Sequence, residues 1–302
     1  MDLRYICCQP ANTYYSWQVE VMLDNFNKMG IDPEMIDIVS GYIGAPTPEW
    51  ERLKTKGARF FFYPDTRLDL GYPPSIYFHL MEKHLKAHPE LTNDALFTHD
   101  CDILFTRPPE FADLAYDTTW YMSDTNSYIN YDYVVSKGEE QFLQMCSIVG
   151  ISPDLVKANN QHAGGAQYIV KGTTPEFWSK VERDSMAIYS YLVPREAQWT
   201  GQGYVIQKWT AGMWAYLWNA YLIAPVQVTE RMNFTWATSG IDTIQTFPIY
   251  HNAGVVDNKQ KMFYKADYGL RNPYNDNLEI DQTKASYWYW SQLKETAKTT
   301  VL

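Results

Sequence analysis

The first hundred residues alternate between segments typical of strands and segments typical of helices, and this alternation constrains the fold more than any other feature. Strands are predicted from apolar runs, and helices from apolar side chains recurring every three to four residues. The predicted strands cover residues 3–8, 35–41, 58–64 and 95–105, and the helices cover 15–29 and 75–88. Such alternation is typical of a parallel sheet with crossover helices. We therefore expect an α/β fold with a mostly parallel central sheet and flanking helices.

The ends of the two early helices carry recognisable signals. The first stops at Gly30, and the second begins at Ser75, which we expect to cap it behind Pro73 and Pro74. Such helices would return the chain from the end of one strand to the start of the next. In sheets of this kind, ligands bind beyond the carboxyl ends of the strands, where the strand order reverses.

The second half of the chain is less regular, but no linker separates it from the first. Helices are predicted at 137–150, 175–191 and 207–223, with a glycine-rich stretch at 159–172 and a loop near 194–203. From Val226 onward, short strands and turns lead into an irregular tail. We therefore expect one continuous domain over residues 1–302.

Charge and cysteine content limit the classes of function. The formal net charge is −10 and the sequence pI is about 5.1, so the average surface would repel nucleic acid and phosphate unless a cation intervened. The four cysteines form no recognisable disulfide framework, which favours a reducing compartment. Neither a signal peptide nor a membrane-spanning run is recognisable, so we expect a soluble, cytoplasmic protein.

Two carboxylates stand at the end of the predicted strand 95–105. On an extended strand, residues two apart face the same side, so Asp100 and Asp102 would project together. Their mutual repulsion predicts a bound cation, and oxygen ligands suit Mg²⁺ or Mn²⁺. The alternative is a solvated turn or a cap of the following segment.

A zinc site is a weaker interpretation of the same region. His99 and Cys101 could bind zinc together with Cys7 or Cys8 of a neighbouring strand. The spacing matches no standard zinc pattern, and buried strand side chains explain these residues more simply.

These motifs together resemble those of the GT-A nucleotide-sugar glycosyltransferases. The resemblance runs over about residues 2–270 and rests on "HDCD" as a DxD motif, on "HAGGAQY" and on the late histidine of "IYHNAGV". It is strongest toward the hydroxyproline arabinosyltransferase and serine galactosyltransferase group with its bacterial and viral relatives. The resemblance implies a nucleotide-binding half at 1–105, a donor-sugar and acceptor half at 106–270 and a C-terminal tail at 271–302.

The resemblance also implies roles for individual residues. Asp100 would contact the nucleotide ribose or the metal, Asp102 would bind the metal, and His251 would be a third metal ligand. A manganese ion accepts one imidazole among oxygen ligands. The alternative for His251 is a loop histidine bonded to backbone.

Further residues would bind the donor. Gly164 and Gly165 permit close backbone approach or a positive φ, and Gln167 beside them offers hydrogen bonds, whereas an ordinary turn before a strand would also explain them. In similar transferases this region lies against the donor sugar. Gln9 and Asn12 match the position at which such folds hold the nucleotide base.

The candidate catalytic residues are three carboxylates. Asp124 follows a strand-like run and would contact the donor sugar, or else cap a turn. Similar proteins often carry an acid where this chain has Gly212, so that role is vacant or has moved to Glu196 or Asp242. The exposed-loop residues Trp199 and Trp209 are candidate sugar platforms, whereas the aromatic side chains at 214, 218 and 221 are expected to be core.

We therefore expect a Mn²⁺- or Mg²⁺-dependent transferase that moves a sugar from a nucleoside diphosphate sugar to a hydroxyl of a carbohydrate, glycoprotein or other acceptor. The expected donor is a UDP-sugar. The closest-looking relatives retain the anomeric configuration. One alternative is a phage-type transferase acting on modified DNA bases, against which the net charge counts. Another is a non-catalytic carbohydrate-binding protein on a degenerate transferase fold. A third is a nucleotidyltransferase, but the usual glycine-rich basic loop for a triphosphate is missing from the sequence.

Overall fold

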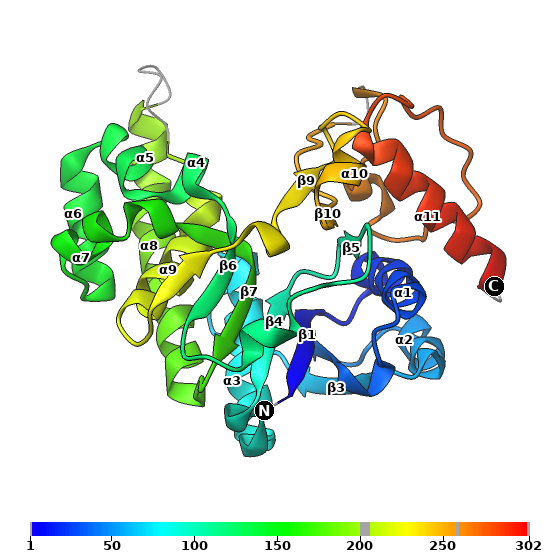
Figure 1. Ribbon diagram of the computed structural model, residues 1–302, viewed down its shortest axis with the longest axis horizontal. Helices are drawn as coiled ribbons and strands as arrows, with labels where there is room; N and C mark the ends of the chain where they lie inside the picture. Colours follow the sequence, from blue (N-terminus) through cyan, green and yellow to red (C-terminus); the bar gives the residue numbers. More distant parts are fainter. Residues whose placement is uncertain (1, 200–205, 258–259, 301–302) are drawn as a thin grey trace. The chain divides into compact units, whose positions relative to one another are not determined.

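Two sheets organise the chain in the computed structural model, which describes residues 2–199, 206–257 and 260–300, the side chains of 196–199 excepted (Figure 1). The larger sheet has seven strands in the order β3-β2-β1-β4-β7-β6-β8, and the smaller has three in the order β5-β10-β9. Pairings of β1 with β2, β2 with β3 and β6 with β8 are parallel, whereas β7 is antiparallel to β4 and β6. The predicted α/β class with a mixed, mostly parallel central sheet and flanking helices is confirmed.

Contacts between residues divide the chain into two compact units, each assembled from separate stretches of sequence. Unit 1 comprises Met1–Arg4, Asp65–Thr98 and Asp113–Glu230, and unit 2 comprises Tyr5–Pro64, His99–Ala112 and Arg231–Leu302. Neither unit follows the predicted halves at 1–105 and 106–270. The organisation as a single domain stays a prediction.

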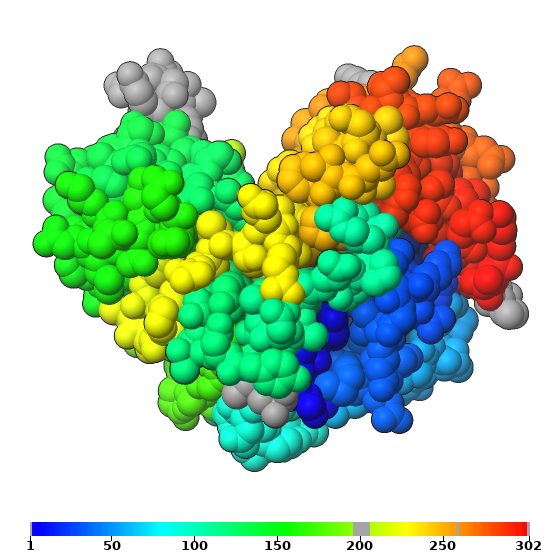
Figure 2. Space-filling model, viewed as in Figure 1, coloured from blue at the N-terminus to red at the C-terminus, as the bar shows by residue number. Residues whose placement is uncertain are grey.

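Unit 2 contains the first three parallel strands and the smaller sheet. Its strands are β1 (Leu3–Pro10), β2 (Ile36–Tyr42), β3 (Arg59–Pro64), β5 (Ile103–Phe105), β9 (Phe234–Trp236) and β10 (Ile249–His251). Its helices are α1 (Thr13–Lys28), α2 (Glu49–Leu53), α10 (Thr243–Thr246) and α11 (Ala285–Thr299). Figure 2 shows the red C-terminal segment against the blue N-terminal segment, in agreement with the packing of α11 on α1.

Unit 1 contains the remaining strands and a helical layer. Its strands are β4 (Ala95–His99), β6 (Trp120–Asp124), β7 (Gly164–Lys171) and β8 (Val226–Val228). Its helices are α3 (Ile76–Ala87), α4 (Asn126–Ile129), α5 (Tyr131–Ser136), α6 (Glu139–Val149), α7 (Pro153–Ala158), α8 (Pro175–Trp199) and α9 (Ala211–Tyr221). Helix α8 packs on both α3 and α9, and the expected core aromatic residues of α9 are buried.

Several sequence predictions about element ends were wrong. The strand predicted at 95–105 is two strands, because β4 ends at His99 and β5 joins the other sheet. Helix α8 continues through Pro194 to Trp199, where a loop was expected. The tail contains the 15-residue helix α11 and is therefore not irregular throughout. Ser75 does not cap α3 with its side chain; its hydroxyl instead accepts a bond of 2.9 Å from Arg67.

The carboxylate of Glu20 on α1 is the centre of a buried polar network in unit 2. Its side chain is fully buried and accepts hydrogen bonds from two guanidinium nitrogens of Arg52 on α2. The hydroxyl of Tyr274 donates to it at 2.7 Å, and that of Thr300, which follows α11, at 2.9 Å. These bonds outweigh the effect of burial and lower the pKa of Glu20. One carboxylate thus connects four segments distant in sequence.

We predict that Glu20→Gln destabilises unit 2 by about 3 kcal/mol, because it leaves the guanidinium of Arg52 without its buried partner. The measurement is the free energy of unfolding in urea. Glu51→Gln is the matched control, since Glu51 pairs with Lys54 at 2.8 Å in solvent and its loss should change stability by less than about 1 kcal/mol. Equal effects of the two variants would contradict the importance of the Glu20 network.

Candidate metal centre

The register of the smaller sheet brings Asp102 to His251. Strand β5 is antiparallel to β10, with Ile103 opposite His251. Asp102 lies in the turn before β5, and its carbonyl accepts the N–H of Asn252 at 3.0 Å. Because the two strands are paired in this register, residues about 150 positions apart in the sequence become neighbours.

Three potential metal-binding side chains meet at this turn. Their ligand atoms, from Asp100, Asp102 and His251, all lie within 4.8 Å of one another. The Nε2 of His251 is 3.3 Å from Oδ1 of Asp102 and 3.6 Å from Oδ2 of Asp100. Adjacent ligand atoms around a Mg²⁺-sized ion lie about 3 Å apart, so small side-chain movements would suffice for coordination. The donor set therefore fits a divalent ion.

The two aspartates differ from the sequence expectation in how they are presented. They lie in the turn after β4 rather than on an extended strand, so the argument from alternating strand faces was wrong for residues 100 to 102. The side chain of Asp100 is 54% exposed, whereas that of Asp102 is 6% exposed. The turn thus buries one carboxylate and leaves the other open to solvent.

His251 is held mainly by aromatic packing. Its ring stacks on Trp236 of the parallel neighbour β9, with centroids 5.7 Å apart and planes at 18°, and it also packs on Phe234. Its buried Nδ1 has no hydrogen-bond partner among the described residues. A metal-bound imidazole usually donates its second N–H to an acceptor. Here stacking takes over the orienting role, which corrects the alternative of a histidine bonded to backbone.

Lys265 is the residue of this cluster that sequence reasoning missed. Its ammonium forms an ion pair with Oδ2 of Asp102. Burial opposes charge on Asp102, but Lys265 and His251 outweigh burial and hold the pKa of that carboxyl well below its usual range. Burial likewise lowers the pKa of His251, and Asp102 more than reverses this effect. No motif marks "FYKADYG", and the sequence analysis predicted a bound metal ion rather than a lysine beside the carboxylates.

The other predicted residues of unit 2 do not join this cluster by any direct contact that the structure shows. Gln9 is buried and donates to Val39 and Ser40 of β2, and Asn12 caps α1 by accepting the N–H of Tyr15. Asp242 is exposed at the start of α10. The proposed base-binding and catalytic roles of these residues stay predictions, and their observed bonds are structural.

In unit 1, the two predicted donor-site glycines lie in closely packed surroundings. A Cβ at Gly164 would lie 2.2 Å from Cβ of Met122, and one at Gly165 would lie 2.3 Å from Cε of Met213. Neither has a positive φ; the left-handed residue of this stretch is Ala166, with φ of 66°. Both glycines belong to β7 rather than to a turn. Close strand packing accounts for Gly164, whereas the atom nearest to a Cβ at Gly165 is the end of a methionine side chain on α9, and the donor contacts of both glycines stay predictions.

The remaining predicted residues of unit 1 also have structural partners. Gln167 is fully buried, its Oε1 accepts from Ser123 at 2.7 Å, and its Nε2 has no partner among the described residues. Asp124 accepts the backbone N–H of Asn126 at 2.8 Å, as the capping alternative predicts. The side chains of Glu196 and Trp199 lie outside the described residues. Trp209 is 56% exposed.

Gly212 shows why the expected acid is absent at that position. Its N–H donates to the hydroxyl of Tyr72 at 2.8 Å. A Cβ there would lie 3.0 Å from that hydroxyl and 3.1 Å from the ring of Phe78. An acidic side chain would have to enter this aromatic packing, and the transfer of the expected acid's role to Glu196 or Asp242 stays a prediction.

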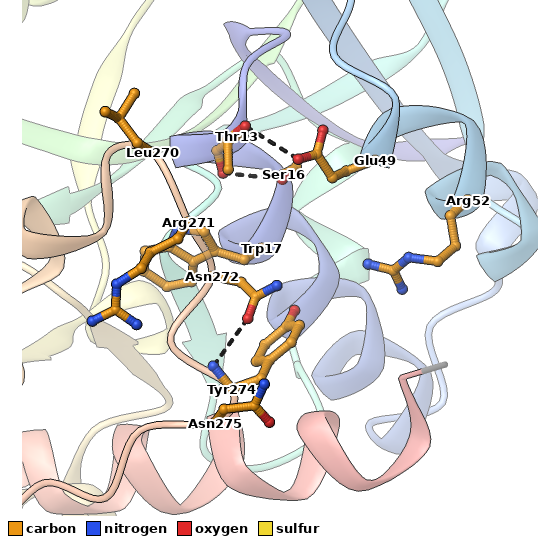
Figure 3. Close-up of a pocket in the computed structure, with 10 residues that line it drawn as sticks. All are labelled: Thr13, Ser16, Trp17, Glu49, Arg52, Leu270, Arg271, Asn272, Tyr274 and Asn275. Carbon is orange, nitrogen blue, oxygen red and sulfur yellow. Dashed lines mark hydrogen bonds between the residues drawn. The ribbon is translucent and has the colours of Figure 1, made fainter. Parts of the chain in front are cut away.

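A separate pocket of about 280 Å³ lies in unit 2 (Figure 3). Its lining includes Thr13, Glu49 and Asn272 and two arginines, but none of the three clustered side chains. Both arginines form ion pairs with carboxylates. Arg52 pairs with Glu20, and Arg271 pairs with Asp276 at 2.7 Å. The pocket therefore offers no free guanidinium for an anion.

The zinc interpretation of His99 and the cysteines has no support within the described part of the chain. The cysteines at 7, 8, 101 and 146 are buried free thiols, and the groups that could hold a metal contain no cysteine among the described residues. Within the same residues, every helix is too short or too polar to cross a membrane.

We predict that the two aspartates differ sharply in their contribution to stability without metal. Asp102→Asn leaves the partly buried Lys265 without its counter-charge and should lower the free energy of unfolding by about 3 kcal/mol. Asp100→Asn removes a repulsive neighbour from a half-exposed position and should change stability by less than about 1 kcal/mol or increase it. Chemical unfolding in EDTA compares the variants, and equal losses would contradict this description of the turn.

Comparisons with known proteins give only a distant structural likeness. No family model matches the sequence, and no curated protein matches it. Among solved structures, the chain is similar to the galactosyltransferase LgtC in complex with donor and acceptor sugar analogues, at 13% identity and a TM-score of 0.48, over 99% of this chain and 97% of that one. The chain is similar to an active-site mutant of LgtC at 13% identity and a TM-score of 0.47, with the same coverage of both chains. A likeness of this degree carries no argument about activity.

Proposed function

We propose that the chain is a metal-dependent glycosyltransferase of the GT-A type. It would transfer a sugar from a nucleoside diphosphate sugar, with UDP as the expected nucleotide, to a hydroxyl acceptor with retention of configuration. The observation that carries the proposal is the meeting of Asp100, Asp102 and His251 at one turn, with Lys265 on the buried carboxylate. The motif resemblance supports it independently of the geometry.

The donor atoms determine which ion fits. Two carboxylates and one imidazole suit Mn²⁺, and Mg²⁺ less well because of the nitrogen ligand. A divalent ion bound there would stabilise, as a Lewis acid, the negative charge that develops on a departing diphosphate. Asp102 would be the fixed ligand because burial and Lys265 hold it in place, and half-exposed Asp100 would adjust to the ion.

The charges of the cluster favour a diphosphate once a cation is bound. Asp100, Asp102 and Lys265 sum to one negative charge, so the turn alone repels phosphate. A divalent ion would convert this sum to one positive charge. The side chain of Lys265 is 30% exposed, and its ammonium would then add a hydrogen-bond donor for a phosphate oxygen. This arrangement overcomes locally the net charge of −10 on the chain.

The rest of the reaction rests on predictions from sequence. Asp124, Glu196 and Asp242 stay candidate catalytic carboxylates, and Gly164, Gly165 and Gln167 candidate donor contacts. Gln167 is supported by its buried amide, whose Nε2 has no partner in the described parts of the chain. A single domain over residues 1–302 and a cytoplasmic location belong to the same proposal.

We predict Mn²⁺-dependent hydrolysis of at least one donor in a panel of UDP- and GDP-sugars, measured as nucleoside diphosphate release with Mn²⁺ and with EDTA. Asp102→Asn should reduce the rate about 100-fold or more, because it removes the fixed metal ligand. Asp32→Asn is the matched control: Asp32 caps a short helix in the same unit, and asparagine retains the oxygen that accepts the N–H of Glu34.

Each outcome of this experiment separates the alternatives. Hydrolysis that survives EDTA, or that Asp102→Asn leaves unchanged, would refute the metal role. A thermal shift with a UDP-sugar but no turnover with any acceptor would favour the carbohydrate-binding protein. Salt-sensitive binding to DNA would favour the enzyme acting on modified bases.

A further inference from the structure

A second cluster of metal-binding side chains lies in unit 1, far in sequence from the first. It consists of His79 and Glu82 of α3 and Glu182 of α8. Because His79 and Glu82 are three residues apart, they share one face of α3. One ligand atom from each of the three lies within 4.8 Å of the others. The packing of α8 on α3 therefore completes a donor set that neither helix has alone.

The imidazole of His79 is oriented as a metal ligand requires. Its Nδ1 lies 3.1 Å from Oε2 of Glu182, and its Nε2 lies 3.1 Å from the hydroxyl of Thr66. A ligating histidine usually binds the ion through one nitrogen and donates the other N–H to an oxygen. Thr66 is such an oxygen, and it leaves Nδ1 facing the carboxylate of Glu182.

The carboxylates gain from a cation at this point. The side chain of Glu82 is 17% exposed and that of Glu182 is 19% exposed. Two carboxylates this close with so little solvent repel one another. Lys86 pairs with Glu82 at 2.6 Å, but its side chain is 60% exposed and gives weak compensation. A small divalent ion among the three ligand atoms would neutralise both acids at once.

We propose that His79, Glu82 and Glu182 form a binding site for a divalent ion of the zinc class. Zinc ligands at 2.0–2.1 Å in tetrahedral geometry lie about 3.3 Å apart, and His79 Nδ1 and Glu182 Oε2 are already 3.1 Å apart. Glu82 has only to swing inward from Lys86. Three protein ligands leave the fourth position to water, and the ion would join α3 to α8.

This site is separate from the proposed glycosyltransferase function and does not rest on it. The two clusters share no residue and belong to different units. Both clusters offer one imidazole and two carboxylates, so the same ion could bind either of them, and the test has to disable the first cluster. Because the clusters share no residue, variants of one leave the ligands of the other in place.

The test uses the full chain in the Asp102→Asn background, so that the first cluster does not bind the ion. We expect metal analysis after dialysis against Zn²⁺ to find one ion per chain, and Zn²⁺ to raise the melting temperature by several degrees, because the ion binds only the folded state. Glu182→Gln keeps the volume and the hydrogen bond to His79 but should weaken Zn²⁺ affinity at least about tenfold.

The chain contains a matched control for the Glu182 variant. His88 and Glu90 form a more exposed pair in the same unit with the same spacing, Nδ1 and Oε1 being 3.1 Å apart, but no third metal-binding side chain joins them among the described residues. Glu90→Gln should therefore retain zinc binding. The proposal is overturned if Glu182→Gln and Glu90→Gln bind zinc equally, or if the Asp102→Asn protein binds none. If Glu182→Gln fails to fold by circular dichroism, Glu82→Gln, at the edge of the cluster, gives the same comparison.

Discussion

The pairing of β5 with β10 is the constraint on which the candidate metal centre depends. Each strand has three residues, and their register places Ile103 opposite His251. A slip by one residue would turn the side chain of His251 to the other face of the sheet, away from the aspartates. The pairing is supported from outside the strands, since Asn25 of α1 both donates to and accepts from the backbone of Phe105, at 3.0 and 2.8 Å. A buried amide in the first helix thus fixes the position of a late histidine.

Electrostatics gives the same turn two different states. Without an ion, Lys265 provides the positive charge that Asp102 needs, and Nε2 of His251 lies 3.3 Å from the other oxygen of this carboxylate. With an ion, Lys265 can remain on Oδ2 while Oδ1 turns to the metal. The carboxylate has two oxygens with separate partners, so coordination need not break the ion pair. A lysine at this position therefore makes the centre stable when empty and attractive to phosphate when filled.

The parts of the fold that sequence could predict are those governed by local patterns. The strands at β1, β2 and β3 and the helices α1 and α3 were anticipated because apolar periodicity and flanking turn residues are local signals. The exit of the chain at Asp100 into another sheet was not, because β5 exists only through its partner some 145 residues later. For the same reason the pair of aspartates was found from sequence, whereas Lys265 was not. Packing is equally hidden in the sequence: a Cβ at Gly164 would meet Met122 of the neighbouring strand β6, although the donor-binding role of Gly164 and Gly165 stays a prediction.

The position of Lys265 depends in turn on the C-terminal helix α11, which was not predicted from the sequence. The N–H of Phe263, two residues before the lysine, donates to the hydroxyl of Ser286 on α11 at 2.8 Å. The ammonium of Lys294 on the same helix donates to the carbonyl oxygens of Tyr274 and Asp276, at 2.6 and 2.9 Å. These bonds hold the segment between β10 and α11, which has no strand of its own among its described residues. Helix α11 therefore acts on the metal centre without touching it, by fixing the segment that carries the charge beside Asp102.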